Sequence, residues 1–137
     1  LGGQRAQRAW GPYQLQAAIA ACHARARTAD ETDWPQIVAL YDALSASVPS
    51  PVVELNRAVA VGMAFGPDAA LPLVDALVDE PVMQRYHLMH SVRADLLAKL
   101  GRNDEARAAL ERAVELTSNE QERQLLRQRV RGLTTTH

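Results

Sequence analysis

Two histidines, His87 and His90, are three positions apart in a segment with helical character, and Asp95 follows them. On one helix face this spacing is geometrically compatible with a metal site. The sequence offers no third ligand at a recognisable spacing, because Cys22 and His23 lie far away along the chain. We therefore interpret these histidines as packing and hydrogen-bonding residues, and expect no metal and no cofactor.

The single cysteine, Cys22, lies on the apolar side of a predicted helix, and no base is placed to activate its thiol. We expect it in the core. The sequence contains no glycine-rich phosphate loop, no G-x-S-x-G elbow and no paired-carboxylate motif with a supporting context. These patterns predict a protein that is not an enzyme, and one lone cysteine fits a reducing compartment.

Arginines 123, 127 and 131 follow one another at helical spacing near the end of the chain. A row of this kind could engage a phosphate or an acidic surface. Glu120, Glu122 and several glutamines dilute its charge, so a solvated structural face is the favoured interpretation.

Composition and charge limit the function classes further. The 137 residues hold 15 Lys and Arg against 16 Asp and Glu, a formal net charge of −1, which lacks the basic excess of a nucleic-acid-binding domain. No apolar run of about 18 residues predicts a membrane span, and no secretory signal is visible, so we expect a cytoplasmic protein. Because the chain starts at Leu1 rather than Met, we expect a fragment of something longer.

Alanine-rich segments separated by confined Gly and Pro residues favour helices over strands. Prolines 12 and 51 suit first helical positions, Asp33, Ser50 and Asn103 suit N-caps, and Ser118 with Gln121 resembles a capping box. The third predicted helix is apolar nearly all round and should be the most buried. We predict helices at 12–28, 34–48, 51–65, 67–79, 83–100, 103–117 and 119–132, a linker over 1–11, one domain over 12–133 and a tail over 134–137.

The turns recur with a period of about 34 residues, which is typical of tetratricopeptide helix pairs. Asp33, Gly66 and Gly101 mark the recurrence, and the last pair matches the pattern best through Ala94 and Ala106. We therefore expect an all-α, right-handed superhelix of three such pairs. A polar seventh helix, with a seam of Leu125, Leu126 and Val130, would cap its open end.

Superposing the first helices of the pairs places several polar side chains on one concave surface, where such folds bind peptides. The alternative is that Asn56 and Arg57 join neighbouring helices through buried hydrogen bonds. The sequence leaves both interpretations open, a binding groove and a helix-joining role. The predicted groove residues are Tyr13, Gln16, His23, Asn56, Met63, His87, Ser91 and Asp95.

Longer strings carry a more specific signal than the repeat. They include GPYQLQAAIAA (11–21), DWP (33–35), PSPVV (49–53) and LNRAVAV (55–61), continued by Tyr86-His87 and by the turn at 100–102. Over roughly 11–133 the chain resembles the tetratricopeptide-like C-terminal extension of extracytoplasmic-function sigma factors.

This resemblance implies a bacterial regulatory domain that modulates transcription initiation. Its partners would be the N-terminal sigma regions of the same protein, core RNA polymerase or a regulatory protein. The promoter-reading regions of such factors have no counterpart here, so no direct DNA binding is expected. The alternative is a free-standing adaptor that binds a peptide or protein outside transcription.

Overall fold

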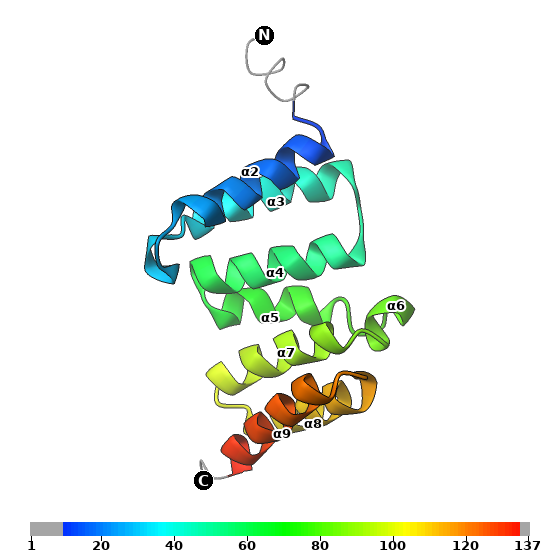
Figure 1. The fold of residues 1–137 in the computed structure, drawn as a ribbon. Helices are drawn as coiled ribbons and strands as arrows, with labels where there is room; N and C mark the ends of the chain where they lie inside the picture. Colours follow the sequence, from blue (N-terminus) through cyan, green and yellow to red (C-terminus); the bar gives the residue numbers. More distant parts are fainter. Residues whose placement is uncertain (1–9, 135–137) are drawn as a thin grey trace.

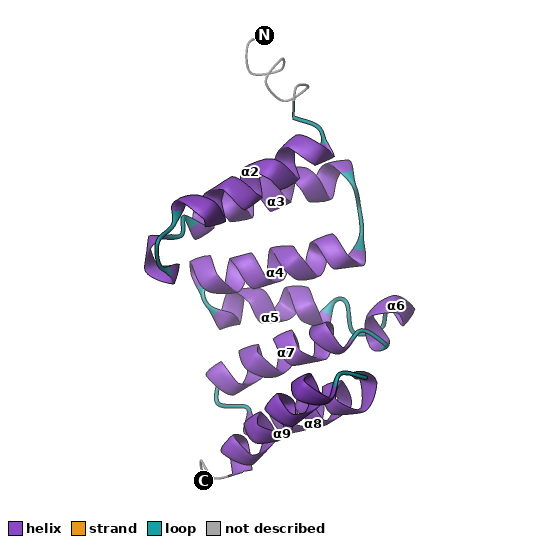
Figure 2. Ribbon diagram, in the orientation of Figure 1, coloured by secondary structure: helices purple, strands orange, loops and turns teal. Residues whose placement is uncertain are grey.

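The computed structural model describes residues 10–134, and this part of the chain is all-α. It forms eight α-helices and one short 3-10 helix, with no strand (Figure 2). The helices are α2 (Pro12–Arg25), α3 (Trp34–Ser47), α4 (Pro51–Phe65), α5 (Pro67–Asp75), α6 (Pro81–Gln84), α7 (His87–Lys99), α8 (Asn103–Leu116) and α9 (Glu120–Thr134), and η1 (Ala29–Glu31) precedes α3. Apart from residues 10, 11 and 134, the predicted linker and tail lie outside the described residues.

The helices are stacked in chain order, with α2 and α3 at one end and α8 and α9 at the other (Figure 1). Most helices pack against their neighbours in the sequence, and α7 packs against α5 across the short α6. No helix in this described part is long and apolar enough to cross a membrane.

Small and aliphatic side chains fill the space between helices. The main cluster runs from Leu15 in α2 to Ala106 in α8, and a second cluster joins α7, α8 and α9 around Leu110 and Leu126. Ala58, Ala106 and other fully buried alanines allow close helix approach. A core of Ala, Leu and Val thus replaces the aromatic residues that this sequence largely lacks.

Local signals explain most helix starts. Prolines occupy the first position of α2, α4, α5 and α6, where a missing N–H costs nothing. Asp33 caps α3 as predicted, because its Oδ1 accepts the Gln36 N–H at 3.2 Å. Ser50 occupies the N-cap position of α4 without a side-chain cap bond.

Two predicted caps are wrong by one residue. Asn103 is the first residue of α8, and Arg102 is its N-cap. Asn119, rather than Ser118, precedes α9, and its Oδ1 accepts the Glu122 N–H at 3.0 Å. Ser118 and Asn119 are both short polar residues that can cap a helix, whereas Arg102 makes no side-chain cap bond.

The predicted helix over 83–100 is two helices. α6 ends at Gln84, the backbone is non-helical at Arg85 and extended at Tyr86, and α7 begins at His87. The break leaves the Gln84 carbonyl available, and it lies 2.9 Å from Nε2 of His90. Met83 is completely buried and anchors α6, so tertiary packing decides this break without a Gly or Pro at its position.

The expectation that α4 is the most buried helix is wrong. Val52, Val59, Met63 and Phe65 are exposed, whereas Leu55, Ala58 and Ala60 are buried. α4 packs against α3 and α5, with lesser contacts to α6 and α7. One apolar side of α4 therefore faces outward.

Candidate binding surface

Two adjoining hollows lie on one side of the stack, where α4, α7 and α9 face outward. The first, of about 540 Å³, lies between α7 and α9 and is lined mainly by His87, Leu88, Ser91, Leu125 and Arg129. The second, of about 320 Å³, lies between α4 and α7. Met63, Asp95 and Lys99 line it, and Ser91 and Arg129 border both hollows. We call them the α7–α9 hollow and the α4–α7 hollow, and together the hollowed face.

Helix packing explains why the α7–α9 hollow is open. α9 packs chiefly on α8 rather than on α7. Leu126 is buried in the cluster with Leu110 and Ala113. Leu125, one residue earlier, points away from that cluster and is 60% exposed, so it does not belong to the predicted seam. The turn from α8 to α9 thus places α9 beside α7 with a gap between their outer surfaces.

A close contact between His87 and Glu122 lies in the lining of the α7–α9 hollow. His87 Nε2 lies 3.1 Å from Glu122 Oε2, although it is not aligned for a hydrogen bond. The Thr117 hydroxyl, in the buried turn before α9, donates to the same carboxylate oxygen at 2.9 Å. Glu122 is therefore already engaged from two directions.

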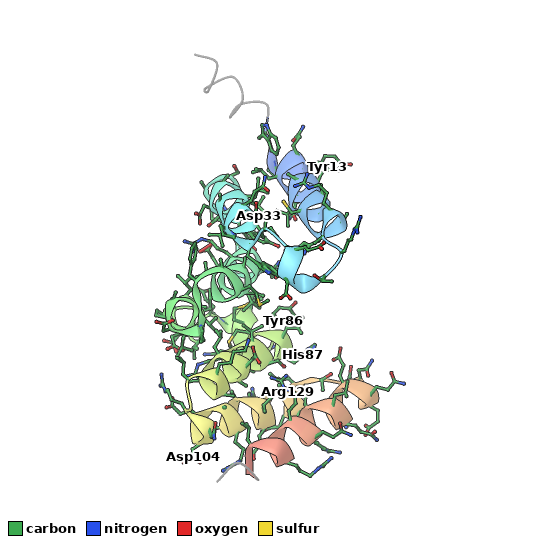
Figure 3. All side chains as sticks on the ribbon, turned by 90° about the vertical axis from the view of Figure 1, so that its left-hand side faces the viewer. Tyr13, Asp33, Tyr86, His87, Asp104 and Arg129 are labelled. Carbon is green, nitrogen blue, oxygen red and sulfur yellow. The ribbon has the colours of Figure 1, made fainter. Side chains whose placement is uncertain are left out.

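A second charged cluster lies where the two hollows meet. Asp95 Oδ2 pairs with Lys99 Nζ at 3.0 Å, and its Oδ1 lies 3.9 Å from Nη2 of Arg129. Two cations therefore share one carboxylate. In Figure 3 His87 and Arg129 lie on the same side of the molecule, between α7 and α9, whereas Asp104 lies on the other side.

Four of the eight predicted groove residues come together here: Met63, His87, Ser91 and Asp95 line one or both hollows. The other four do not line them. Tyr13, Gln16 and Asn56 are exposed elsewhere on α2 and α4, and Tyr13 lies near the opposite end of the stack (Figure 3). His23 makes an edge contact with the Trp34 ring at 5.4 Å between centroids.

The alternative role, joining neighbouring helices through buried hydrogen bonds, is not met as predicted, because Arg57 joins α4 to α3 through an exposed bond. Arg57 Nε donates to Asp42 Oδ1 of α3 at 2.6 Å, and its Nη1 lies 3.5 Å from Glu54. Asn56 is exposed, so it is not a buried polar group that needs a partner.

The histidine pair does not converge. His87 contacts Glu122 on α9, whereas His90 contacts the Gln84 carbonyl. Between residues 10 and 134 no group of three His, Cys, Asp or Glu side chains is arranged to hold a metal ion. Cys22 is buried in the main core cluster, as expected, with Arg25 Nη2 3.5 Å from its sulfur.

The arginine row on α9 lies among acidic side chains. Arg123 donates to the Thr117 carbonyl at 2.7 Å and pairs with Glu120. Arg127 and Arg131 line a separate hollow between α8 and α9, together with Glu111 and Glu115. Alternating charges on this surface agree with the structural interpretation.

Sequence reasoning missed Leu88, Lys99, Leu125 and Arg129. Leu88 and Leu125 are apolar residues that are exposed next to buried neighbours, Met89 and Leu126. The available signal in the sequence was an apolar residue directly beside a buried apolar residue. That signal did not show that Leu88 and Leu125 would face the same gap.

A comparison with known proteins found a relative that matches most of this chain. Over 117 residues, the chain is 50% identical to an uncharacterized protein of Rhizobium meliloti (strain 1021), which covers 85% of this chain. The chain spans about a quarter (27%) of that protein's length. No protein-family model and no solved structure matches the chain.

Proposed function

We propose that this chain is the C-terminal regulatory domain of an extracytoplasmic-function sigma factor, which modulates transcription initiation through protein contacts. In this proposal α2/α3, α4/α5 and α7/α8 are tetratricopeptide-like pairs of a right-handed superhelix, and α9 is its cap. The partner is the N-terminal sigma part of the same protein, core RNA polymerase or a regulator.

The main support for a binding role is the hollowed face. Exposed apolar side chains from three helices surround it: Met63 on α4, Leu88 on α7 and Leu125 on α9. Grouped exposure of apolar surface is typical of protein interaction sites. The successive packing of the helices also supports a repeat architecture, since each unit contacts its neighbours in the sequence.

Three further observations support the sigma-factor proposal. The strings at 11–21 and 55–61 resemble those of the sigma-factor extension. A relative about four times as long as the matched segment is compatible with a domain inside a larger protein. The net charge of −1 favours protein contacts over promoter contacts for this segment.

Run-off transcription with core RNA polymerase and the full-length gene product tests this function. We expect the wild-type protein to give promoter-specific initiation. The amount of transcript should change at least about tenfold in a Met63→Asp/Leu88→Asp variant, because charges in an apolar interface are costly. Val82→Asp is the matched control, since Val82 is exposed on α6 outside both hollows.

Circular dichroism checks that each variant remains folded. Normal initiation by the folded double variant would contradict a role for the hollowed face. Absence of polymerase-dependent initiation by the wild-type product would replace the sigma-factor proposal with the adaptor alternative.

A further inference from the structure

We propose that the hollowed face binds an acidic amphipathic segment of a protein partner. Apolar side chains of the segment enter the α7–α9 hollow, and its carboxylates meet Arg129 and Lys99 at the border of the α4–α7 hollow. The inference deepens the proposed interaction role and rests on it for the biological context only.

The apolar part of the argument comes from residues that the fold leaves uncovered. Leu88 and Leu125 are exposed on opposite walls of the α7–α9 hollow. Val59 and Met63 continue the apolar surface across the α4–α7 hollow. A hollow of about 540 Å³ lies within the range of about 300–1,000 Å³ that is usual for binding pockets. Burying these walls removes apolar surface from water, which favours a ligand that has its own apolar stripe.

The charged part of the argument decides the sign of the partner. Arg129 lies 3.9 Å from Asp95, an ion-pair distance too long for a hydrogen bond, so its guanidinium donors are available for another carboxylate. Lys99 is more than half exposed and competes for the same Asp95. Asp95 offsets one of these two positive charges, so the border keeps a local excess of one, which an acidic segment meets favourably and a basic segment unfavourably.

The remaining carboxylate of the face does not reverse this preference. Glu122 lies at the other end of the α7–α9 hollow, where it contacts His87 and accepts the Thr117 hydroxyl. The cationic border and the apolar walls are thus separate parts of one surface. An amphipathic segment matches this separation, because its apolar and acidic side chains occupy different faces.

Synthetic peptides and the 137-residue chain test the proposal directly. One 16-residue probe carries leucines at helical spacing with glutamates on its polar face. A second probe has lysines in place of the glutamates, and a third keeps the glutamates but replaces the leucines with serines. We expect the first probe to bind at least about tenfold more tightly than either other probe, with an affinity that falls as salt rises.

Matched variants then locate the site. Arg129→Glu should weaken binding of the acidic probe about tenfold, since it replaces an attraction with a repulsion. Arg112→Glu should change it less than about twofold, although Arg112 on α8 has a similarly exposed side chain (47% against 43%). Leu125→Asp should also weaken binding about tenfold, with Val82→Asp as the apolar control.

Three results would overturn the inference: equal binding of the acidic and lysine probes, equal effects of Arg129→Glu and Arg112→Glu, or no binding of the acidic probe at millimolar concentration. Sedimentation provides a fourth, because a dimer that Leu125→Asp converts to monomer would identify a second copy as the occupant. Polymerase-dependent initiation by the wild-type product is measured without these peptides, so failure of this inference is distinguishable from failure of the proposed function.

Discussion

Met83 is the anchor of the segment that positions α7, and its removal gives a quantitative test of the fold. It lies in the four-residue helix α6, has no exposed surface and contributes to the main core cluster. A helix of this length has no independent stability. Met83→Ala should therefore loosen α6 and, with it, the contact between the Gln84 carbonyl and His90.

The expected loss follows from complete burial. Truncation of a fully buried methionine to alanine costs about 2–5 kcal/mol, from lost transfer free energy and the remaining cavity. Unfolding entropy of about 2 cal/mol/K per residue corresponds to about 0.3 kcal/mol per kelvin for 137 residues. A loss of about 3 kcal/mol thus predicts a decrease in Tm of about 10 K.

Urea unfolding and thermal melts followed by circular dichroism measure both quantities. Val82→Ala is the matched control, because Val82 is the adjacent residue of the same helix and is 66% exposed. We expect the control to change the free energy of unfolding by less than about 0.5 kcal/mol. A loss below about 1 kcal/mol for Met83→Ala, or equal losses for the two variants, would refute the anchoring role.

Two further predictions concern pH and backbone conformation. Burial raises the pKa of the Tyr41 phenol above its usual 10.0. The contribution of the neutral phenol to stability is complete below the unfolded-state pKa and is lost as the pH rises through the folded-state pKa. Urea unfolding across this alkaline range should therefore show a smaller loss of stability for Tyr41→Phe than for the wild type. Identical pH profiles of the two proteins would contradict the prediction. Gly101 follows Leu100, the C-cap of α7, with φ +79° and open space around its Cβ position, so Gly101→Ala should cost about 1 kcal/mol through strain alone. Gly132→Ala, in equally open helical surroundings, should stabilise by about 0.5–1 kcal/mol, and urea unfolding that gave both variants the same sign would contradict this account.

Local signals made most helix positions predictable. Pro12, Pro51 and Pro67 begin helices in the sequence and in the structure, and Asp33 caps α3. These signals act through the backbone N–H groups of one helical turn, so they need no information about distant residues. The break at Arg85 lacked such a signal, because burial of Met83 and the approach of His90 produce it.

The candidate surface was only partly predictable. Superposition of the repeats placed Met63, His87, Ser91 and Asp95 on one surface, and all four line the hollows, since helical spacing determines which residues share a face. It also included Tyr13 and Gln16, which lie outside both hollows, because a repeat alignment says nothing about the distance between α2 and α7.

The sequence by itself determined the all-α class, the start of most helices and the small residues at which they approach one another. Tertiary structure alone decided which apolar residues remain in water and which charges meet. Leu125 and Leu126 are equally apolar, yet only Leu126 is buried, because α9 packs on α8 and leaves a gap to α7. The same packing brings Arg129 of α9 close to Asp95 of α7. Exposure and ion pairing depend on the positions of neighbouring helices, whereas helix formation depends mainly on residues within a few turns of one another.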